Sequence, residues 1–168
     1  KHIYEMIKAG ANIIDVGGES TRPGSKTVLT SMEWRRIENI VKNFKKKHKK
    51  TCLSIDTRKS EVMIKAIKHR ADLINDVSGF NYDSQSLSRL KTHKVAKVLH
   101  HMQGTPNTMQ KNPKYKNVLL DIYDFFEKSI KKIDSKKIVI DPGIGFGKNL
   151  KHNLTLISKI SLFHSLGL

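Results

Sequence analysis

Residues 51–80 read TCLSIDTRKSEVMIKAIKHRADLINDVSGF and contain one complete strand–helix–strand unit. Two short apolar runs, 51–56 and 72–77, each finish in polar residues. Runs of this length suit strands that are buried on both faces of a parallel sheet. Between them, apolar residues at 62, 63, 66 and 67 recur at the spacing of a helix. The segment therefore predicts a βαβ unit in an α/β fold.

The same order of elements extends along the chain in both directions. Further strands are predicted at 11–16, 95–101 and 137–141, and helices are predicted around 34–44, 87–90, 118–130 and 154–163. The opening segment ends at Gly10 like the tail of a helix, and Thr30 or Ser31 with Glu33 offers an N-cap for the next one. Five strand–helix units suit either an open doubly wound sheet or a (β/α)8 barrel. A complete barrel needs about 250 residues. We therefore expect one domain, residues 1–168, that is a barrel truncated at both ends.

The composition favours a soluble, globular protein rather than a disordered one. The net charge is +17, but the lysines are spread along the chain without the aromatic interleaving that stacks nucleic-acid bases. We expect solvated lysine faces, and no nucleic-acid partner. No apolar run approaches the roughly 20 residues of a membrane span, and the first residues do not form a signal peptide. Cys52, the single cysteine, lies in an apolar run and is expected to be buried. These features predict a cytoplasmic protein with no membrane partner.

Polar side chains finish all five predicted strands. They are Asp15, Asp56, Asn75, Asp76, His100, His101 and Asp141. One such residue is often a structural cap, but the carboxyl ends of parallel strands share one edge of a sheet, so the repetition predicts a functional pocket. The two adjacent histidines point to opposite faces of a strand and cannot chelate one ion together, so we do not expect a zinc site.

Glycine-rich loops follow the first and the last predicted strand. Residues 17–25 combine glycines with hydroxyl groups and Arg22, which suits an anionic substrate and a loop that closes over it. Residues 142–148 contain a partial G-x-G pattern that is neither a Walker P-loop nor a full dinucleotide fingerprint. Taken alone, the second loop is a weak signal.

Five segments, in this order and spacing, resemble the motifs of the dihydropteroate synthase family. They are residues 13–24, 54–57, 74–79, 101–104 and 140–149. The resemblance covers essentially the whole chain, and it implies a (β/α)8 barrel of which this chain supplies strands two to six with their helices.

The resemblance also implies a transferase of folate (tetrahydrofolate) biosynthesis. Such an enzyme condenses 6-hydroxymethyl-7,8-dihydropterin pyrophosphate with p-aminobenzoate to give 7,8-dihydropteroate and pyrophosphate, and sulfonamides compete with p-aminobenzoate. It uses Mg²⁺, whose asparagine ligand is expected upstream of Lys1, so no metal ligand is expected within this chain. The resemblance further implies a homodimer at full length. Because strands one, seven and eight are expected outside residues 1–168, the fragment by itself is expected to be inactive.

Roles for individual residues follow from the same resemblance. Substrate-binding positions match Thr21, Arg22, Pro23, Asp56, Asn75, Asp141, Phe146 and Lys148. Asp56, Asn75 and Asp141 match pterin-binding positions, and the two carboxylates among them are expected to stabilise positive charge on the pterin methylene group. Pro23 and Phe146 line the p-aminobenzoate pocket. Arg22 helps with the pyrophosphate or with loop closure, and Lys148 helps to hold its loop. Structural roles stay open for Asp15 and Asp76, and Phe146 could be a plain hydrophobic plug.

The chain also departs from the family pattern. Arg58-Lys59-Ser60 stands where many relatives have Ser/Thr-Lys-Pro, and His100 stands where an apolar residue is common. Two alternatives are weaker. A pterin-dependent methyltransferase would bind methyltetrahydrofolate, but residues 20–24 favour the synthase. A basic binding protein or degenerate enzyme is disfavoured because all three pterin-binding positions are intact.

Overall fold

The computed structural model describes residues 2–133 and 137–168 and contains one parallel sheet. Its strands are β1 (Ile13–Gly17), β2 (Cys52–Asp56), β3 (Leu73–Asp76), β4 (Ala96–His100) and β5 (Ile138–Asp141), and they lie side by side in the order β1-β2-β3-β4-β5. A doubly wound sheet would reverse direction at a switch point. The strictly sequential order is instead the winding of a barrel, so the fold is a partial (β/α)8 barrel, and the five predicted strands are confirmed.

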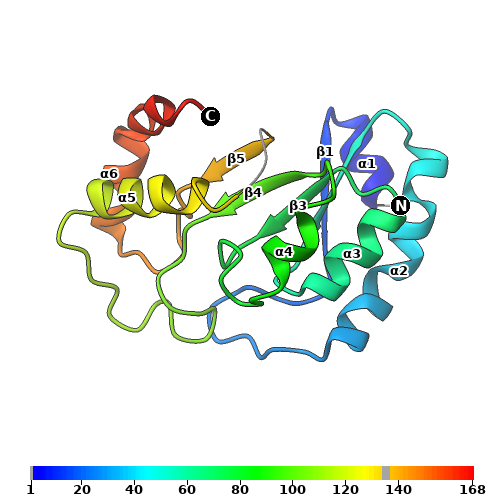
Figure 1. Ribbon diagram of the computed structural model, residues 1–168, viewed down its shortest axis with the longest axis horizontal. Coiled ribbons are helices and arrows are strands. Elements are labelled where there is room, and N and C mark those ends of the chain that lie inside the picture. The colour runs from blue at the N-terminus through cyan, green and yellow to red at the C-terminus, as the bar shows by residue number, and fades with distance from the viewer. Residues whose placement is uncertain (1, 134–136) are drawn as a thin grey trace.

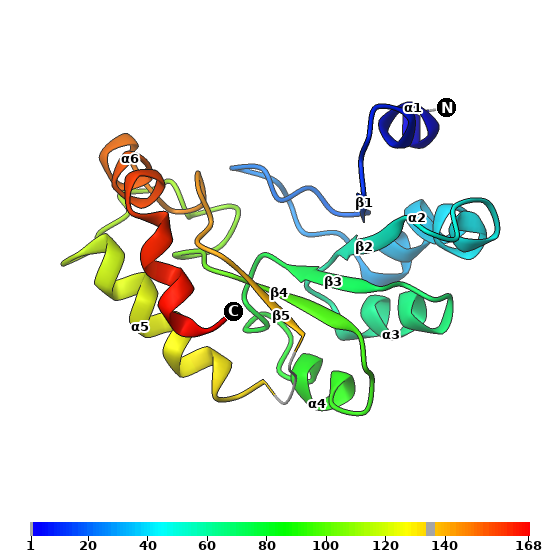
Figure 2. The same cartoon turned by 90° about the horizontal axis from the view of Figure 1, so that it is seen from above.

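Helices line the outer side of the curved sheet (Figures 1 and 2). They are α1 (His2–Lys8), α2 (Thr30–Lys47), α3 (Ser60–Lys68), α4 (Ser86–Leu90), α5 (Val118–Ile130) and α6 (Leu150–Ser158), followed by the 3₁₀ helix η1 (Ile160–Leu166). Among the described residues, no helix lies on the concave side of the sheet (Figure 2). Ile13 on β1 and Val139 on β5 are accordingly 54% and 55% exposed there.

The hydrophobic core lies between the sheet and its helices. Leu53, Ile55 and Ile74 are fully buried, as are Val41 of α2 and Phe126 of α5. Each such side chain contributes about 1.5–3 kcal/mol by burial. Successive side chains of a strand alternate between the two faces of the sheet. The residues next to the core positions, at 54, 56 and 75, therefore face the concave side.

Three local predictions from the sequence are wrong. The N-cap of α2 is Leu29, which makes no side-chain cap bond, and Glu33 is buried instead of folding back on a cap. The last predicted helix starts earlier, at Leu150, because Asn149 and His152 form a capping box there, and it breaks into a 3₁₀ helix after Ser158. Cys52 is half-buried, because it faces the concave side.

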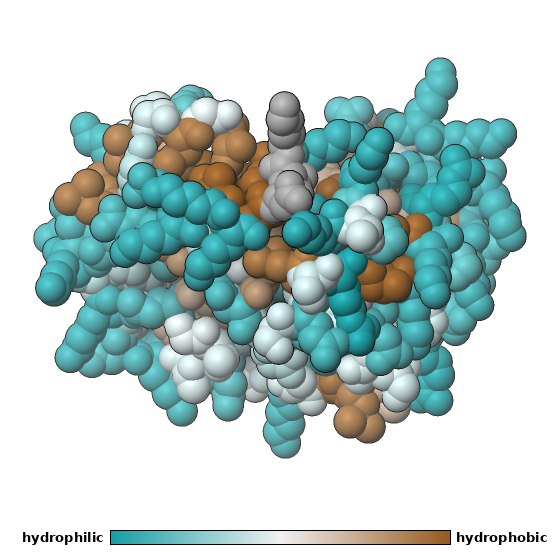
Figure 3. Space-filling view, in the orientation of Figure 1, coloured by the Kyte–Doolittle hydropathy of each residue, from teal (hydrophilic) through white to brown (hydrophobic). Residues whose placement is uncertain are grey.

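The surface is mostly hydrophilic, with apolar side chains gathered at one end over α6 and η1 (Figure 3). Leu154, Ile157 and Ile160 are each about half exposed. Within residues 2–133 and 137–168, none of the helices has the length and apolar character needed to cross a membrane.

Candidate functional site

The first part of the candidate site is a polar cluster on the concave side of β1, β2 and β3. Strand register places Asp56 between Gly17 and Asn75. The Asn75 amide donates a hydrogen bond to Asp15 Oδ2 at 3.2 Å. Asp56 Oδ1 and Asn75 Oδ1 are both buried, and neither has a hydrogen-bond partner among the described residues. A buried unpaired acceptor costs about 1–3 kcal/mol, so an N–H donor placed against this cluster would relieve that cost.

The surroundings of Asp56 make its ionised form expensive. Burial, followed by the negative charges of Asp15, Asp76 and Glu33, raises the pKa of Asp56 to about 7. Gly17 leaves space for this carboxyl group, because a Cβ at Gly17 would lie 3.2 Å from Asp56 Oδ2. A ligand that brings hydrogen-bond donors or positive charge would relieve this cost.

The second part of the site lies at the ends of β4 and β5, where His100 and Asp141 are register partners. Asp141 Oδ1 accepts a hydrogen bond from the Gly143 N–H at 2.8 Å. Its Oδ2 lies 3.9 Å from His100 Nε2, and the Asp141 side chain is 48% exposed. This carboxylate is therefore held by the loop after β5 while one oxygen remains available to a ligand.

Lys148 holds the loop that follows Asp141. Its side chain is 3% exposed, and Nζ donates to the Phe146 carbonyl at 2.9 Å and to the His101 carbonyl at 3.3 Å. Nζ also lies 3.1 Å from His101 Nδ1. Burial lowers the pKa of Lys148 to about 7, and burial with the Lys148 charge lowers the pKa of His101 to about 3. The imidazole of His101 is therefore neutral and accepts from Lys148. The expectation of solvated lysines fails here and at Lys59 and Lys97, which are also buried.

The loop after β1 reaches across to the loop after β4. The Gly24 N–H donates to the Pro106 carbonyl at 3.1 Å. Within the loop, the Ser25 hydroxyl donates to the Ser20 carbonyl at 2.7 Å. Three predicted substrate-binding residues lie on this loop. Thr21 is half-buried, and Arg22 and Pro23 are exposed.

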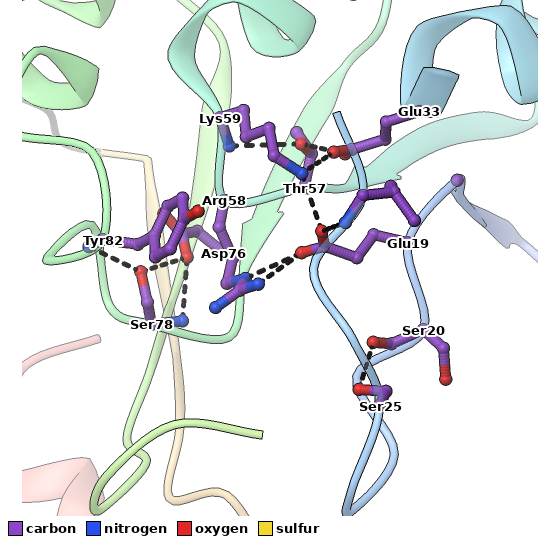
Figure 4. Close-up of polar contacts among 12 residues, drawn as sticks. Glu19, Ser20, Ser25, Glu33, Thr57, Arg58, Lys59, Asp76, Ser78 and Tyr82 are labelled. Atoms are coloured by element: carbon purple, nitrogen blue, oxygen red, sulfur yellow. Dashed lines mark hydrogen bonds and ion pairs between the residues drawn. The ribbon is translucent and has the colours of Figure 1, made fainter. Parts of the chain in front are cut away.

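A buried network of charges anchors the base of this loop (Figure 4). Glu19 bonds to Arg58 and to Lys59, whose Nζ lies 2.7 Å from Glu19 Oε2. Lys59 also pairs with Glu33, which accepts from the Thr57 hydroxyl. Burial alone would raise the pKa of Glu19, but the hydrogen bonds from Lys59 and Arg58 outweigh it and hold the pKa below its usual range. The network ties the loop after β1 to α2 and to the start of α3.

Sequence reasoning missed this network, although one signal could have revealed it. Glu33 lies on the same helical stripe as Ile37, Val41 and Phe44, all of which are buried. A carboxylate on a core-facing stripe needs a cationic partner. The nearest basic residues that follow a strand are Arg58 and Lys59, outside the residues that received a role.

Two of the polar strand-end residues do not face the concave side. Asp76 is fully buried, and its Oδ1 accepts from the Ser78 N–H and hydroxyl at 2.8 and 2.6 Å. Burial raises the pKa of Asp76 to about 6, against the effect of those hydrogen bonds. The His101 ring packs edge-on against Phe125 of α5, with ring centroids 4.9 Å apart. Each of the two follows a residue that points inward, so alternation turns it toward the helices. Of the seven strand-end residues, Asp76 and His101 therefore lie outside the group on the concave side, and the expected opposite orientation of His100 and His101 is confirmed.

Two further features bear on what this protein could bind. The described residues contain no group of three or more His, Cys, Asp or Glu side chains arranged to hold a metal ion. A hollow of about 780 Å³ lies between α1 and α2, lined by Tyr4, Ile40 and Phe44 among others. It is on the outer side of the sheet and contains none of the polar groups that end the strands.

Comparison with known proteins adds independent evidence. Dihydropteroate synthase of Escherichia coli (strain K12) is 39% identical over 173 residues, which cover 100% of this chain and 61% of that protein. The relative from Bacillus subtilis (strain 168), also named dihydropteroate synthase, is 37% identical over 171 residues, which cover 99% of this chain and 57% of that protein. A crystal structure of Yersinia pestis dihydropteroate synthase with a sulfonamide drug complex matches with a TM-score of 0.95 and 37% sequence identity. The match covers 99% of this chain and 62% of that one.

The chain thus spans about three fifths of the length of these relatives. A family model described as "Pterin binding enzyme" matches residues 1–168, that is, every residue of the chain. On the strength of that match, the chain belongs to the family of pterin-binding enzymes.

Proposed function

We propose that this chain forms the pterin-binding part of a dihydropteroate synthase, a transferase of folate biosynthesis. The observation that carries the proposal is the pair of buried, unpartnered acceptors, Asp56 Oδ1 and Asn75 Oδ1, on the concave face of the sheet. The amino-pyrimidine edge of a pterin presents several N–H donors in one plane. A site with such acceptors rejects ligands that lack those donors, because its own groups then stay unpaired.

The proposed reaction needs negative charge near the pterin methylene carbon. In that reaction, the amine nitrogen of p-aminobenzoate forms a bond to this carbon as the bond from carbon to the pyrophosphate oxygen breaks. Positive charge builds on the pterin in the transition state, and the carboxylates of Asp56 and Asp141 stabilise it. Asp56 suits this role because it is costly to ionise without such a partner. The departing pyrophosphate carries the electron pair away, and the nitrogen of the new C–N bond gives up one proton to solvent water.

The loops supply the remaining proposed contacts. Arg22 is exposed on the loop after β1, where its guanidinium group is free to grip the pyrophosphate bidentately. Pro23 on the same loop and Phe146 from the loop after β5 line the p-aminobenzoate side, and Thr21 is a further substrate contact. Lys148 acts through Phe146, because it donates to the Phe146 carbonyl and so fixes that loop.

Several properties of the whole protein belong to the same proposal. Mg²⁺ would neutralise charge on the pyrophosphate; no ligand for it is assigned among the described residues. A homodimer, a cytoplasmic location and partners that are small molecules rather than nucleic acid are proposed from the likeness to the synthases. Because the chain covers about three fifths of those relatives, we propose that residues 1–168 by themselves bind the pterin without completing the reaction.

Calorimetric titration with 6-hydroxymethylpterin tests the proposal. We expect Asp56→Asn to weaken binding at least tenfold, because a hydrogen bond to a charged group contributes about 1.5–3 kcal/mol. Asp124→Asn, the same chemical change at an exposed position on α5, should leave the affinity unchanged. Absence of pterin binding, or equal binding by Asp56→Asn, would contradict the proposal. Retention of labelled methyltetrahydrofolate in preference to p-aminobenzoate would support a methyltransferase instead.

A further inference from the structure

The loop after β4, residues 101–117, has no role in the proposed reaction, yet it contacts both loops that carry the proposed p-aminobenzoate residues. Its Pro106 carbonyl accepts from the Gly24 N–H at 3.1 Å, directly beside Pro23 in the loop after β1. The later part of the same segment reaches the loop after β5, which carries Phe146. One segment therefore joins the two proposed walls of the p-aminobenzoate pocket.

Two side chains of this segment hold the backbone on either side of Phe146. The Tyr115 hydroxyl donates to the Gly147 carbonyl at 2.8 Å, and the Gln110 amide nitrogen donates to the Gly145 carbonyl. Burial raises the pKa of Tyr115 to about 12, so its hydroxyl keeps the proton that it donates. Glycine gives a backbone wide freedom, and Gly145 and Gly147 have φ of +85° and +64°. A loop of this kind needs outside bonds if it is to present Phe146 in one place.

The bonds leave the loop after β5 little freedom at Phe146. Because Lys148 donates to the Phe146 carbonyl at 2.9 Å, the three consecutive carbonyls of residues 145–147 each accept from a side chain. The Phe146 N–H donates in turn to the Gly143 carbonyl at 3.0 Å. The Phe146 ring is half-buried and meets the His100 ring edge-on, with centroids 4.6 Å apart. The backbone is thus fixed while part of the ring stays open to a ligand.

The segment that supplies these bonds is itself well fixed. Gln103 Oε1 accepts from the Lys114 N–H at 2.8 Å, and Gln103 Nε2 donates to the Lys114 carbonyl at 2.7 Å, which ties the two ends of the segment together. Met109, next to Gln110, is 3% exposed. A side chain that touches a substrate keeps its position only when a further set of contacts holds it. The loop after β4 meets that requirement for Phe146.

We propose that Gln110 and Tyr115 are positioning residues, which hold Phe146 in place for p-aminobenzoate by donating to the carbonyls on either side of it. This inference rests on the proposed function and deepens it. Both side chains bond to the loop after β5, whereas Asp56 Oδ1 and Asn75 Oδ1 have no partner among the described residues. Loss of either donor should therefore weaken p-aminobenzoate binding and leave pterin binding intact.

Two variants and a matched control test this role. Tyr115→Phe removes only the hydroxyl, and Gln110→Met replaces the amide with a group of similar length that cannot donate. Gln110 is exposed, so its variant tests the role even if Tyr115→Phe does not fold. Tyr123→Phe is the control, because the Tyr123 hydroxyl lies 3.1 Å from Ser165 Oγ, between α5 and η1. Each protein is titrated calorimetrically with 6-hydroxymethylpterin and then, at saturating pterin, with p-aminobenzoate, and its unfolding in urea is measured alongside.

We expect Tyr115→Phe and Gln110→Met to weaken p-aminobenzoate binding about three- to tenfold, the value of one net hydrogen bond, at unchanged pterin affinity. Tyr123→Phe should change neither affinity. In a Phe146→Ala background, Gln110→Met should have no further effect, because it acts through Phe146.

The remaining outcomes separate the inference from the proposal on which it rests. An equal loss of both affinities, or the same loss in the Phe146→Ala background, would show a structural role only and would overturn the inference. Variants that bind p-aminobenzoate as the parent does, or a parent that binds the pterin but not p-aminobenzoate, would overturn the inference alone. A parent that does not bind the pterin would overturn the proposed function itself.

Discussion

The Asp56→Asn substitution should stabilise the unliganded chain at neutral and alkaline pH while it impairs pterin binding. Asp56 ionises inside the protein only against burial and the charges of Asp15, Asp76 and Glu33. Asparagine has nearly the same shape and no charge to bury. A substitution that improves stability and removes binding is the mark of a residue kept for function.

The size and the sign of the effect follow from the pKa of this one group. Its pKa is about 7 in the folded chain and 3.8 in the unfolded chain. Between these values the folded chain binds more protons than the unfolded chain, so the unfolding free energy falls as the pH rises. Each pH unit well inside this window corresponds to about 1.4 kcal/mol, and the slope halves at the folded pKa, so Asp56 should cost roughly 2 kcal/mol between pH 5 and pH 7, and little more above that.

Urea unfolding followed by circular dichroism at pH 5, 6, 7 and 8 measures this directly. The difference in unfolding free energy between Asp56→Asn and the parent chain should grow by about 2–3 kcal/mol from pH 5 to pH 8. The charge repulsion between Asp56 and Asp76 is part of the measured difference, whereas the burial of Asp76 is common to both proteins. Parallel pH profiles, or a variant that is the less stable of the two at pH 8, would refute the reasoning.

The structure makes three further predictions. Lys59→Met leaves two buried glutamates without their shared cation and should lower the unfolding free energy in urea by about 3–5 kcal/mol. Arg58→Ser should cost less, because Lys59 still pairs with both glutamates. An equal loss of unfolding free energy in the two variants would show that the network does not act as described. Gly143→Ala should destabilise the chain more than Gly145→Ala in the same assay, because both glycines have positive φ but only the first has backbone where a Cβ would lie. Pterin affinity, measured by calorimetry, should fall as the pH drops below about 7. Asp56 then takes up a proton and cannot accept from the ligand as a carboxylate. An affinity that stays constant from about pH 8 to pH 5 would contradict this.

The sequence predicted the fold well because each strand is a compact apolar run with a polar end. Such runs are informative even without a structure, and all five lie where they were expected. The pattern did not choose between a doubly wound sheet and a barrel, because that choice depends on the order of strands in space. Only the chain length and a resemblance to a family favoured the barrel before the strand order was known.

The site was less predictable, for reasons that lie in single residues. Successive residues of a strand point to opposite faces of the sheet, which separates Asn75 from Asp76 just as it separates His100 from His101. Asp76 therefore lies on the face opposite the site, although it also ends a strand. The partner of Glu33 could not be found by local reasoning, because Lys59 lies 26 positions away in the sequence. Pairing across elements is fixed by tertiary packing, and a pattern of residue types does not encode it.

The most direct test of the account is a crystal structure of this chain soaked with 6-hydroxymethylpterin. The account predicts that the pterin lies on the concave face, with N–H groups about 3 Å from Asp56 Oδ1 and Asn75 Oδ1, which are two of the four buried side-chain atoms without a partner among the described residues. A pterin bound in the hollow between α1 and α2 instead, with both acceptors still unpaired, would contradict it.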